Sequence, residues 1–397
     1  MVRHRIQLEQ LEKRLLLTVG VALDDGSLVI DGVADGDVVI TGSENGFNVT
    51  DDGIAVGDAD LDVTGGIRIA LDDGEEEGDA DNVVTIDLGG EAVDSVIARL
   101  GEGNNSLTLS GGTVDRRLWY RGGDGDDDVT VAAETVIGRG IFAHLGDGTN
   151  SLTVAGEVGG GIVVSGGDGD DSVTVADGGS VARLLFARLG SGDNSVDVAG
   201  SVGSSLLVHG RDGADSIAVT GSVGRRITAK LGDGDNTVTL GDNGDEEVST
   251  VGKHVTVRAG DGDDSVTIEA GATVGRNVNL HLGGGENTVT HAGAIGGNLF
   301  IRTDNAEDAD RVDIAEDSVE GRVNTKFGAE HDPVSHFVRL LQRIRGRGRG
   351  HDNAGDNGDN GDTGDNGHGD HNGHNQQDRV RDIINSIIER LRNRFRR

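Results

Sequence analysis

The chain has 397 residues, but 69 glycines, one proline and 2% aromatic residues exclude a thick globular core. The formal net charge of −35 argues against a nucleic-acid partner, because phosphate-binding surfaces are basic, and it favours divalent cations. The absence of cysteine excludes disulfides and thiolate metal sites. Apolar residues recur in V-x-V pairs, which predicts a repeat protein rather than a disordered one.

Residues 1–19 are basic and amphipathic, and we expect them to be helical. Glu9 and Glu12 interrupt the segment and its apolar run is short, so it makes a poor secretory signal. The heptapeptide LEKRLLL at 11–17 resembles the L-E-P-R-x-L-L motif near the N-terminus of large bacterial surface proteins, with Lys13 replacing proline. The resemblance implies export to the cell surface. The alternative is a helical cap on an open solenoid end.

Residues 20–332 are predicted to form one continuous solenoid. Up to about residue 100 its rungs are degenerate, as in DGDVVITG at 35–42 and FNVTDDG at 47–53. From 100 to 314 a turn resembling GGDGDDSVTV at 166–175 recurs ten times. The sixth positions of these turns are 21–23 residues apart, except for one interval of 28 that contains a polar insertion at 241–250. They are Asn105, Asp127, Asn150, Asp171, Asn194, Asp215, Asn236, Asp264, Asn287 and Asp310.

Each rung of about 22 residues contains two predicted strands. After the turn, Val173 and Val175 point inward and Thr174 outward. A small-residue bend of the type G-x-V-G then leads to a second strand, as in RRITAKLG at 225–232. The pattern predicts an all-β, right-handed parallel β-solenoid with short helical ends, filled by ladders of valine, leucine and isoleucine.

Asp and Asn alternate strictly at the sixth position, and Gly and Leu largely alternate at the first. The genetic unit is therefore a pair of rungs. Asp and Asn either alternate along one edge of the coil or occupy opposite edges. We favour one edge, because 22 residues already contain two strands and two bends.

Two turns, GGDGDDDVT at 122–130 and GGDGDDSVT at 166–174, resemble the G-G-x-G-x-D-x-U-x nonapeptide of repeats-in-toxin (RTX) proteins. The resemblance implies calcium ions between stacked turns, held by glycine carbonyls and sixth-position carboxylates. It assigns ligand roles to Asp127, Asp171, Asp215, Asp264 and Asp310. The motif returns every 22 residues rather than every nine, and Asn lowers the ligand charge, so we expect fewer and weaker ions than in that family.

Crowding of acidic residues adds Asp124, Asp168 and Asp261 to the predicted metal ligands. Stacked carboxylates repel each other unless a cation lies between them. The alternative is plain turn chemistry, in which Asp and Asn bond to the backbone and glycine supplies positive φ. A stacked Asn ladder would stabilise the edge without metal.

Neither a zinc-protease helix, a nucleophile elbow nor a phosphate-binding loop occurs in the sequence, which favours a non-enzymatic protein. Outward Ser and Thr rows, such as Ser172 and Thr174, resemble ice-binding solenoid faces, but threonine is also common on exposed strands. Trp119 and Tyr120 are the best candidates for an anionic-ligand site, but we favour the alternative that they form a protruding contact or packing surface. The arginines that flank them are Arg116, Arg117 and Arg121.

The chain beyond Pro333 is predicted to contain a cap helix over 333–345, a flexible linker over 346–377 and a basic amphipathic helix over 378–397. The last helix suits an anionic membrane or an acidic protein. It could equally pair with itself, fold back on the acidic solenoid or act as a secretion signal.

These patterns predict a bacterial, extracellular or cell-surface protein with a structural or adhesive role, rigidified by calcium after export. Its expected partners are calcium ions and a cell-surface polymer, or an anionic membrane through the last helix, and not nucleic acid. Two alternatives are a carbohydrate-active β-helix enzyme acting on acidic polysaccharide and a metal-free scaffold that polymerises end to end.

Overall fold

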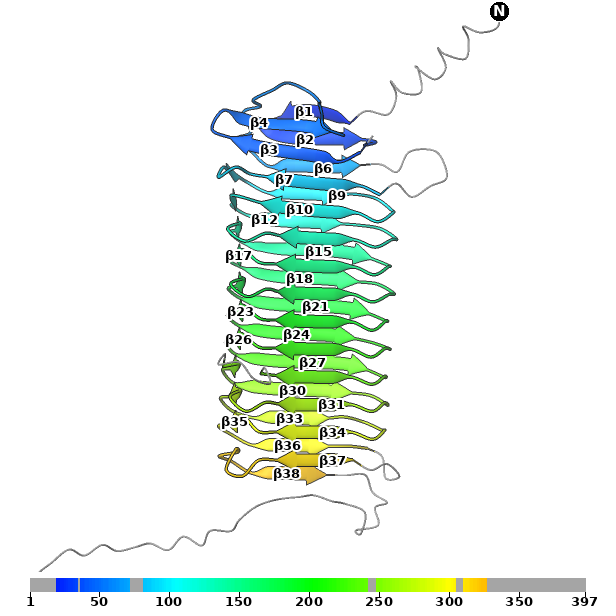
Figure 1. The fold of residues 1–397 in the computed structure, drawn as a ribbon, viewed down its shortest axis with the longest axis vertical. Coiled ribbons are helices and arrows are strands. Elements are labelled where there is room, and N and C mark those ends of the chain that lie inside the picture. The colour runs from blue at the N-terminus through cyan, green and yellow to red at the C-terminus, as the bar shows by residue number, and fades with distance from the viewer. Residues whose placement is uncertain (1–18, 35, 72–80, 242–247, 305–309, 327–397) are drawn as a thin grey trace, which may run out of the picture. The chain divides into compact units, whose positions relative to one another are not determined.

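The computed structural model describes residues 19–34, 36–71, 81–241, 248–304 and 310–326, which form a parallel β-solenoid without a helix (Figure 1). Strands of successive rungs pair in parallel, and equivalent turn residues are 21–23 apart, or 28 across one interval. The predicted fold class and rung length are confirmed. The segments predicted as helices or linker, residues 1–18, 333–345, 346–377 and 378–397, lie outside the described residues.

Three sheets run along the solenoid. Sheet A consists of β1 (Gly20–Asp24), β2 (Ser27–Gly32), β6 (Ile67–Leu71), β9 (Val96–Arg99), β12 (Arg117–Arg121), β15 (Gly140–Gly146), β18 (Gly161–Gly166), β21 (Leu184–Gly190), β24 (Ser205–Gly210), β27 (Arg226–Gly232), β30 (His254–Ala259), β33 (Val278–His281), β36 (Leu299–Arg302) and β38 (Val323–Lys326).

Sheet B consists of β3 (Val38–Ser43), β4 (Gly46–Asp51), β5 (Ile54–Ala55), β7 (Val83–Asp87), β10 (Ser106–Ser110), β13 (Asp128–Val131), β16 (Ser151–Val154), β19 (Ser172–Val175), β22 (Ser195–Val198), β25 (Ser216–Val219), β28 (Thr237–Leu240), β31 (Ser265–Ile268), β34 (Thr288–His291) and β37 (Arg311–Ile314).

Sheet C is a narrow ladder of two-residue strands. It consists of β8 (Ala92–Val93), β11 (Thr113–Val114), β14 (Val136–Ile137), β17 (Glu157–Val158), β20 (Ser180–Val181), β23 (Ser201–Val202), β26 (Ser222–Val223), β29 (Thr250–Val251), β32 (Thr273–Val274) and β35 (Ala294–Ile295).

Sheet C corrects the predicted rung, which had two strands. The G-x-V-G bend of the sequence is a third strand, visible as short arrows at the left edge of Figure 1. Its valine points inward, and Val158, Val181 and Val202 are fully buried. A rung thus runs from sheet B through sheet C to sheet A, and a turn returns it to sheet B.

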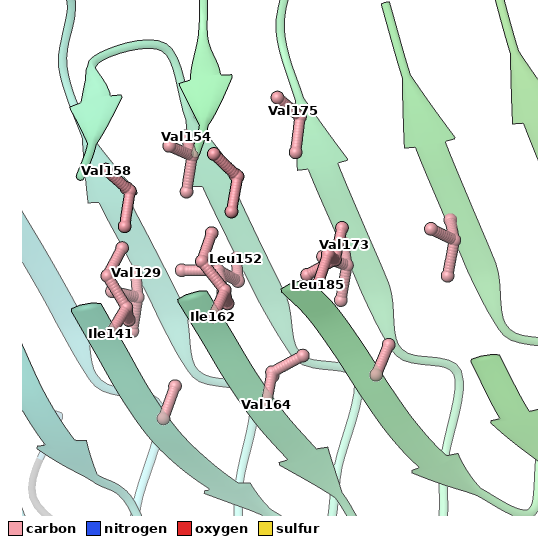
Figure 2. Close-up of a cluster of buried hydrophobic side chains, with 14 of the residues drawn as sticks. Val129, Ile141, Leu152, Val154, Val158, Ile162, Val164, Val173, Val175 and Leu185 are labelled. Atoms are coloured by element: carbon pink, nitrogen blue, oxygen red, sulfur yellow. The ribbon is translucent and has the colours of Figure 1, made fainter. Parts of the chain in front are cut away.

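The core is a set of aliphatic columns, one residue per rung. Val129, Leu152 and Val173 stack in register on sheet B, opposite Ile141 and Ile162 of sheet A (Figure 2). All five are at most 1% exposed. Strict alternation of inward and outward residues builds this narrow core, because successive side chains of a strand point to opposite faces.

The N-terminal end closes with antiparallel strands rather than with further rungs. β1 pairs antiparallel with β2, and β4 lies antiparallel between β3 and β5. Residues 47–53, predicted as a degenerate rung, belong to these hairpins, and Phe47 is buried there. The hairpins cover a sheet end whose unpaired backbone groups would otherwise be open to pairing.

The last strand of the described residues is β38 (Val323–Lys326), which lies inside the range 20–332 predicted for the solenoid. Over the described ranges, no helix is long and apolar enough to cross a membrane.

Candidate functional site: the turn edge

We call the stacked Gly-Asp turns between sheet A and sheet B the turn edge. They lie in register, as shown by the parallel bridges Asp124–Asp147, Asp168–Ser191 and Asp212–Asp233. Asp and Asn therefore alternate along a single edge, which confirms the favoured geometry. The described turns are 100–105, 122–127, 145–150, 166–171, 189–194, 210–215, 231–236, 259–264 and 282–287.

The sixth-position side chains form one continuous hydrogen-bonded ladder inside the solenoid. The backbone N–H of each residue donates to Oδ1 of the side chain one rung later. For example, Asp127 donates to Asn150 over 2.9 Å and Asp171 to Asn194 over 3.0 Å. The ladder also includes Asn82, whose backbone N–H donates to Asn105 over 3.1 Å. Asn82 is not among the ten turn positions identified in the sequence. These bonds serve buried turn N–H groups that would otherwise lack a partner.

Asn and Asp use the ladder differently. Asn150 Nδ2 lies 3.1 Å from the carbonyl oxygens of both Gly146 and Gly148 in its own turn, and 2.9 Å from Asp171 Oδ1. An ionised aspartate has no proton to donate to such carbonyls. Its second oxygen instead lies next to the first residue of the turn, and a Cβ on Gly166 would overlap Oδ2 of Asp171. Glycine accordingly occupies the first position of the Asp127, Asp171 and Asp215 turns, whereas the Asp264 turn has Ala259 there.

Four ladder carboxylates have a buried oxygen without a hydrogen-bond partner among the described residues. They are Oδ2 of Asp127, Asp171, Asp215 and Asp264, whose residues are at most 2% exposed. Asp310 differs, because Thr303 Oγ1 donates to its Oδ2 over 2.7 Å.

Burial changes the acidity of these four carboxyls. It raises the pKa of Asp127, Asp171, Asp215 and Asp264 to about 6, although hydrogen bonds from the preceding asparagine favour the charged form. Each of the four carboxyls therefore changes its protonation state close to neutral pH, inside a core that is otherwise aliphatic.

The other predicted ligands, Asp124, Asp168 and Asp261, are exposed on the outside of the turn edge. Asp168 and Asp261 instead donate their backbone N–H groups to the third-position carboxylates of the preceding rung, Asp168 to Asp147 over 2.8 Å and Asp261 to Asp233 over 2.9 Å. Fifth-position carboxylates also accept from the next rung, as Asp170 does from the Asp193 N–H over 2.7 Å. The turn edge thus has an inner column and two outer columns.

The predicted ligand set does not converge on common points. In the described ranges, no three His, Asp or Glu side chains form a group that could hold a metal ion. Calcium requires six to eight oxygens, whereas a buried carboxylate such as that of Asp171 offers one free oxygen in an apolar core. The outer columns fit a cation better, because their carboxylates stack from rung to rung and solvent can complete the coordination.

The Trp119–Tyr120 pair is divided between two faces. Tyr120 is fully buried and its hydroxyl lies near Asp127, whereas Trp119 points outward from sheet A. Burial and the Asp127 charge raise the pKa of Tyr120. Only Trp119 and its neighbouring arginines can therefore meet an external ligand.

Comparison with known proteins gave no match, either to a protein-family model, to a curated protein or to a solved structure. Function is therefore inferred from the turn edge and the outer faces of the solenoid themselves.

Proposed function

We propose that the protein is a non-enzymatic structural or adhesive rod, secreted or held at the cell surface. The single observation that carries this proposal is the turn edge, an uninterrupted stack of turns in which every rung is bonded to the next. Such a stack gives stiffness along its axis, because each rung contacts only its neighbours and all contacts repeat. The resemblance of residues 11–17 to a surface-protein motif supports export.

Calcium is the proposed cation of this rod, bound at the outer columns of the turn edge. Asp124 and Asp147 occupy the third position of neighbouring rungs, and Asp168 follows them. Three stacked carboxylates repel one another, and a divalent cation between rungs would relieve that repulsion. In this proposal the buried aspartates are ladder residues and not ligands.

The test is thermal melting by circular dichroism, first in calcium and then in excess EDTA. We expect calcium to raise the melting midpoint of the wild-type chain. The outer variant Asp124→Asn/Asp168→Asn/Asp261→Asn should lose most of this shift, because exposed ligand charge is removed. The inner variant Asp127→Asn/Asp171→Asn/Asp264→Asn is its matched control and should keep the shift.

A wild-type midpoint that is indifferent to both calcium and EDTA would overturn the calcium proposal and leave plain turn chemistry. Loss of the shift in the inner variant alone would instead assign calcium to the buried carboxylates.

A metal-free scaffold is the second candidate, favoured by the carboxylates that already accept turn N–H groups. The antiparallel hairpins at the N-terminal end oppose simple end-to-end stacking. Filaments in EDTA, visible by negative-stain electron microscopy, would favour the scaffold. A monomeric chain in EDTA would count against it.

A further inference from the structure

The outward face of sheet A has the opposite charge to the chain as a whole. The sequence contains 70 acidic and 35 basic residues, yet from β9 to β38 no outward position of these strands is Asp or Glu. One outward row is basic at every rung except Ser165: Arg99, Arg121, His144, Arg188, His209, Lys230, Arg258, His281, Arg302 and Lys326. We call this surface the sheet A face.

A second basic row follows the border between sheet C and sheet A. It contains Arg116, Arg117, Arg139, Arg183, Arg225, Arg226, Lys253 and Arg276. Few of these charges are neutralised by the described residues: Arg116 pairs with Asp94, while His281 and Arg302 share Asp304. The positive charges also affect a neighbouring histidine: burial, together with the charges of Lys230 and Arg188, lowers the pKa of His209. Among the described residues, most cationic groups of the sheet A face therefore have no ion-pair partner.

An apolar stripe lies between the two basic rows. Its members are paired in register over six rungs: Ile97, Trp119, Phe142, Val163, Phe186 and Leu207. Phe142 is 38% exposed, as is Phe300 on the outward face of β36. A continuous apolar strip with a charged rim is typical of a binding surface.

The guanidinium groups of two arginines lie over aromatic rings of this stripe. The guanidinium carbon of Arg99 is 5.2 Å from the centre of the Trp119 ring, and that of Arg117 is 5.3 Å from the centre of the Phe142 ring. A cation–π contact of this kind restrains the guanidinium group, whose N–H edge can still bind an anion. That edge suits paired hydrogen bonds to a carboxylate or a sulfate.

Grooves follow the basic rows. One of about 400 Å³ is lined by Arg117, Arg139, Arg183 and Phe142. The next, of about 480 Å³, is lined by Arg226, Lys253 and Arg276 and shares Leu184 with the first. Neighbouring grooves that share a wall suit an extended ligand better than a small molecule.

We propose that the sheet A face binds an extended acidic polysaccharide. Arginines and lysines of the two rows pair with its carboxylates or sulfates, and the apolar stripe contacts the faces of its sugar rings. Rungs about 4.8 Å apart present one set of contacts per rung, comparable to the length of one sugar unit in an extended chain. The inference rests on the adhesive part of the proposed function and names its partner, but it does not depend on calcium.

Charge density favours this ligand over nucleic acid. Duplex DNA carries a charge about every 1.7 Å, and a chain of net charge −35 repels it more strongly than a polymer with one charge per sugar. The acidic turn edge of a second copy is the remaining complementary surface, and the experiment below distinguishes it.

The test is binding of the full chain to polygalacturonate, dextran sulfate and neutral dextran in EDTA, measured by isothermal titration calorimetry. We expect binding to an anionic polymer, weakened by salt, and none to dextran. The variant Arg121→Gln/Arg188→Gln/Lys230→Gln should bind about tenfold more weakly or worse, since these exposed groups form no ion pair with described acids.

The matched control gives the same change in net charge by adding three carboxylates elsewhere, as Ser216→Asp/Ser222→Asp/Thr237→Asp on exposed positions of sheets B and C. It should lose about twofold at most, as expected for distant, screened charges. Trp119→Ala/Phe186→Ala should weaken polysaccharide binding while the circular dichroism spectrum is retained.

Three results would overturn the proposal. They are no binding to either anionic polymer, equal losses in the basic variant and its control, and tighter binding to a single-stranded oligonucleotide than to polygalacturonate. A dimer in analytical ultracentrifugation that the basic variant dissociates would reassign the surface to a second copy. The polysaccharide binding is measured in EDTA, so its result does not depend on whether the protein binds calcium.

Discussion

At the scale of single residues, the alternation of Asp and Asn is an alternation of satisfied and unsatisfied turns. Asn150 donates to two carbonyls of its own turn, whereas Oδ2 of Asp171 is buried without a partner among the described residues. A buried acceptor of this kind costs about 1–3 kcal/mol. The aspartates therefore weaken the folded chain at neutral pH, which implies that something other than stability retains them.

Replacing one of them by asparagine should stabilise the protein. We expect Asp171→Asn to raise the free energy of unfolding by about 1–2 kcal/mol at pH 8 in EDTA, because its Nδ2 can donate to the carbonyls of Gly167 and Gly169. Urea melts followed by circular dichroism would measure the change. Asn194→Asp is the reverse control and should destabilise. A less stable Asp171→Asn variant would show that the oxygen has a partner in solution.

The same carboxyls predict how stability depends on pH. Their pKa is about 6 in the folded chain and 3.8 without burial, so between these values the folded state holds more protons than the unfolded one. The free energy of unfolding should therefore fall as pH rises from about 4 to 7.

Urea melts across that pH window in EDTA would measure this slope. The variant with Asp127, Asp171, Asp215 and Asp264 all changed to Asn keeps the exposed acidic surface and should show a clearly flatter slope. An unchanged slope would mean that surface repulsion alone causes the pH dependence.

At the scale of the elements, the sequence predicted the turns well and the bends poorly. Glycine and a carboxylate at fixed spacing identify a tight turn by its backbone chemistry, so the turn edge was placed correctly. Sheet C was missed because a strand of two residues is too short to show alternation, as at Glu157–Val158.

The burial of the sixth-position residues could have been predicted from the alternation of the strand that follows them. Val173 and Val175 point inward, and counting back by two reaches Asp171 on the same face. The exposed Asp168 lies in the turn itself, where no alternation applies, so the split between inner and outer columns needed the structure. On the sheet A face the sequence singled out only Trp119 and its neighbouring arginines. The rest of that face was missed because its residues are about 22 positions apart and gather only when the rungs stack.

Glycine in the turns is required for two separable reasons. Gly169 has a φ of 125°, and a Cβ there would overlap the carbonyl oxygen of Gly148 in the preceding rung. We expect Gly169→Ala to destabilise by roughly 3 kcal/mol or more. Gly178 has a φ of 79° but open space around it, so Gly178→Ala should cost only about 1 kcal/mol. Thermal melts would compare them, and equal costs would contradict the overlap.

At the scale of the whole solenoid, stability is close to a sum over rungs and their interfaces. The unit that can be removed without changing any interface type is a pair of rungs. Deleting residues 172–215 joins Asp171 to a rung whose sixth position is Asn236, and alternation is kept. Deleting 172–194 places Asp171 next to Asp215 instead.

We expect the two-rung deletion to fold with a nearly unchanged melting midpoint. The one-rung deletion should melt lower at pH 8, because two carboxylates become neighbours in the core, and it should recover near pH 5 as one is protonated. Differential scanning calorimetry at both pH values would measure this. Equal midpoints for the two deletions at pH 8 would show that alternation has no energetic role.

The inner ladder also has a direction. Each buried N–H, such as that of Asp171, donates to a side chain one rung later in the sequence. The outer bonds run the other way, because the Asp168 N–H donates to Asp147 of the preceding rung. When the chain emerges N-terminus first, the inner N–H of each new turn therefore has no acceptor until some 20 further residues have left the ribosome or the export channel. When the chain emerges C-terminus first, the acceptor side chain of the following rung is already in place. The direction in which the chain emerges thus sets the delay before the inner hydrogen bond of each new rung can form.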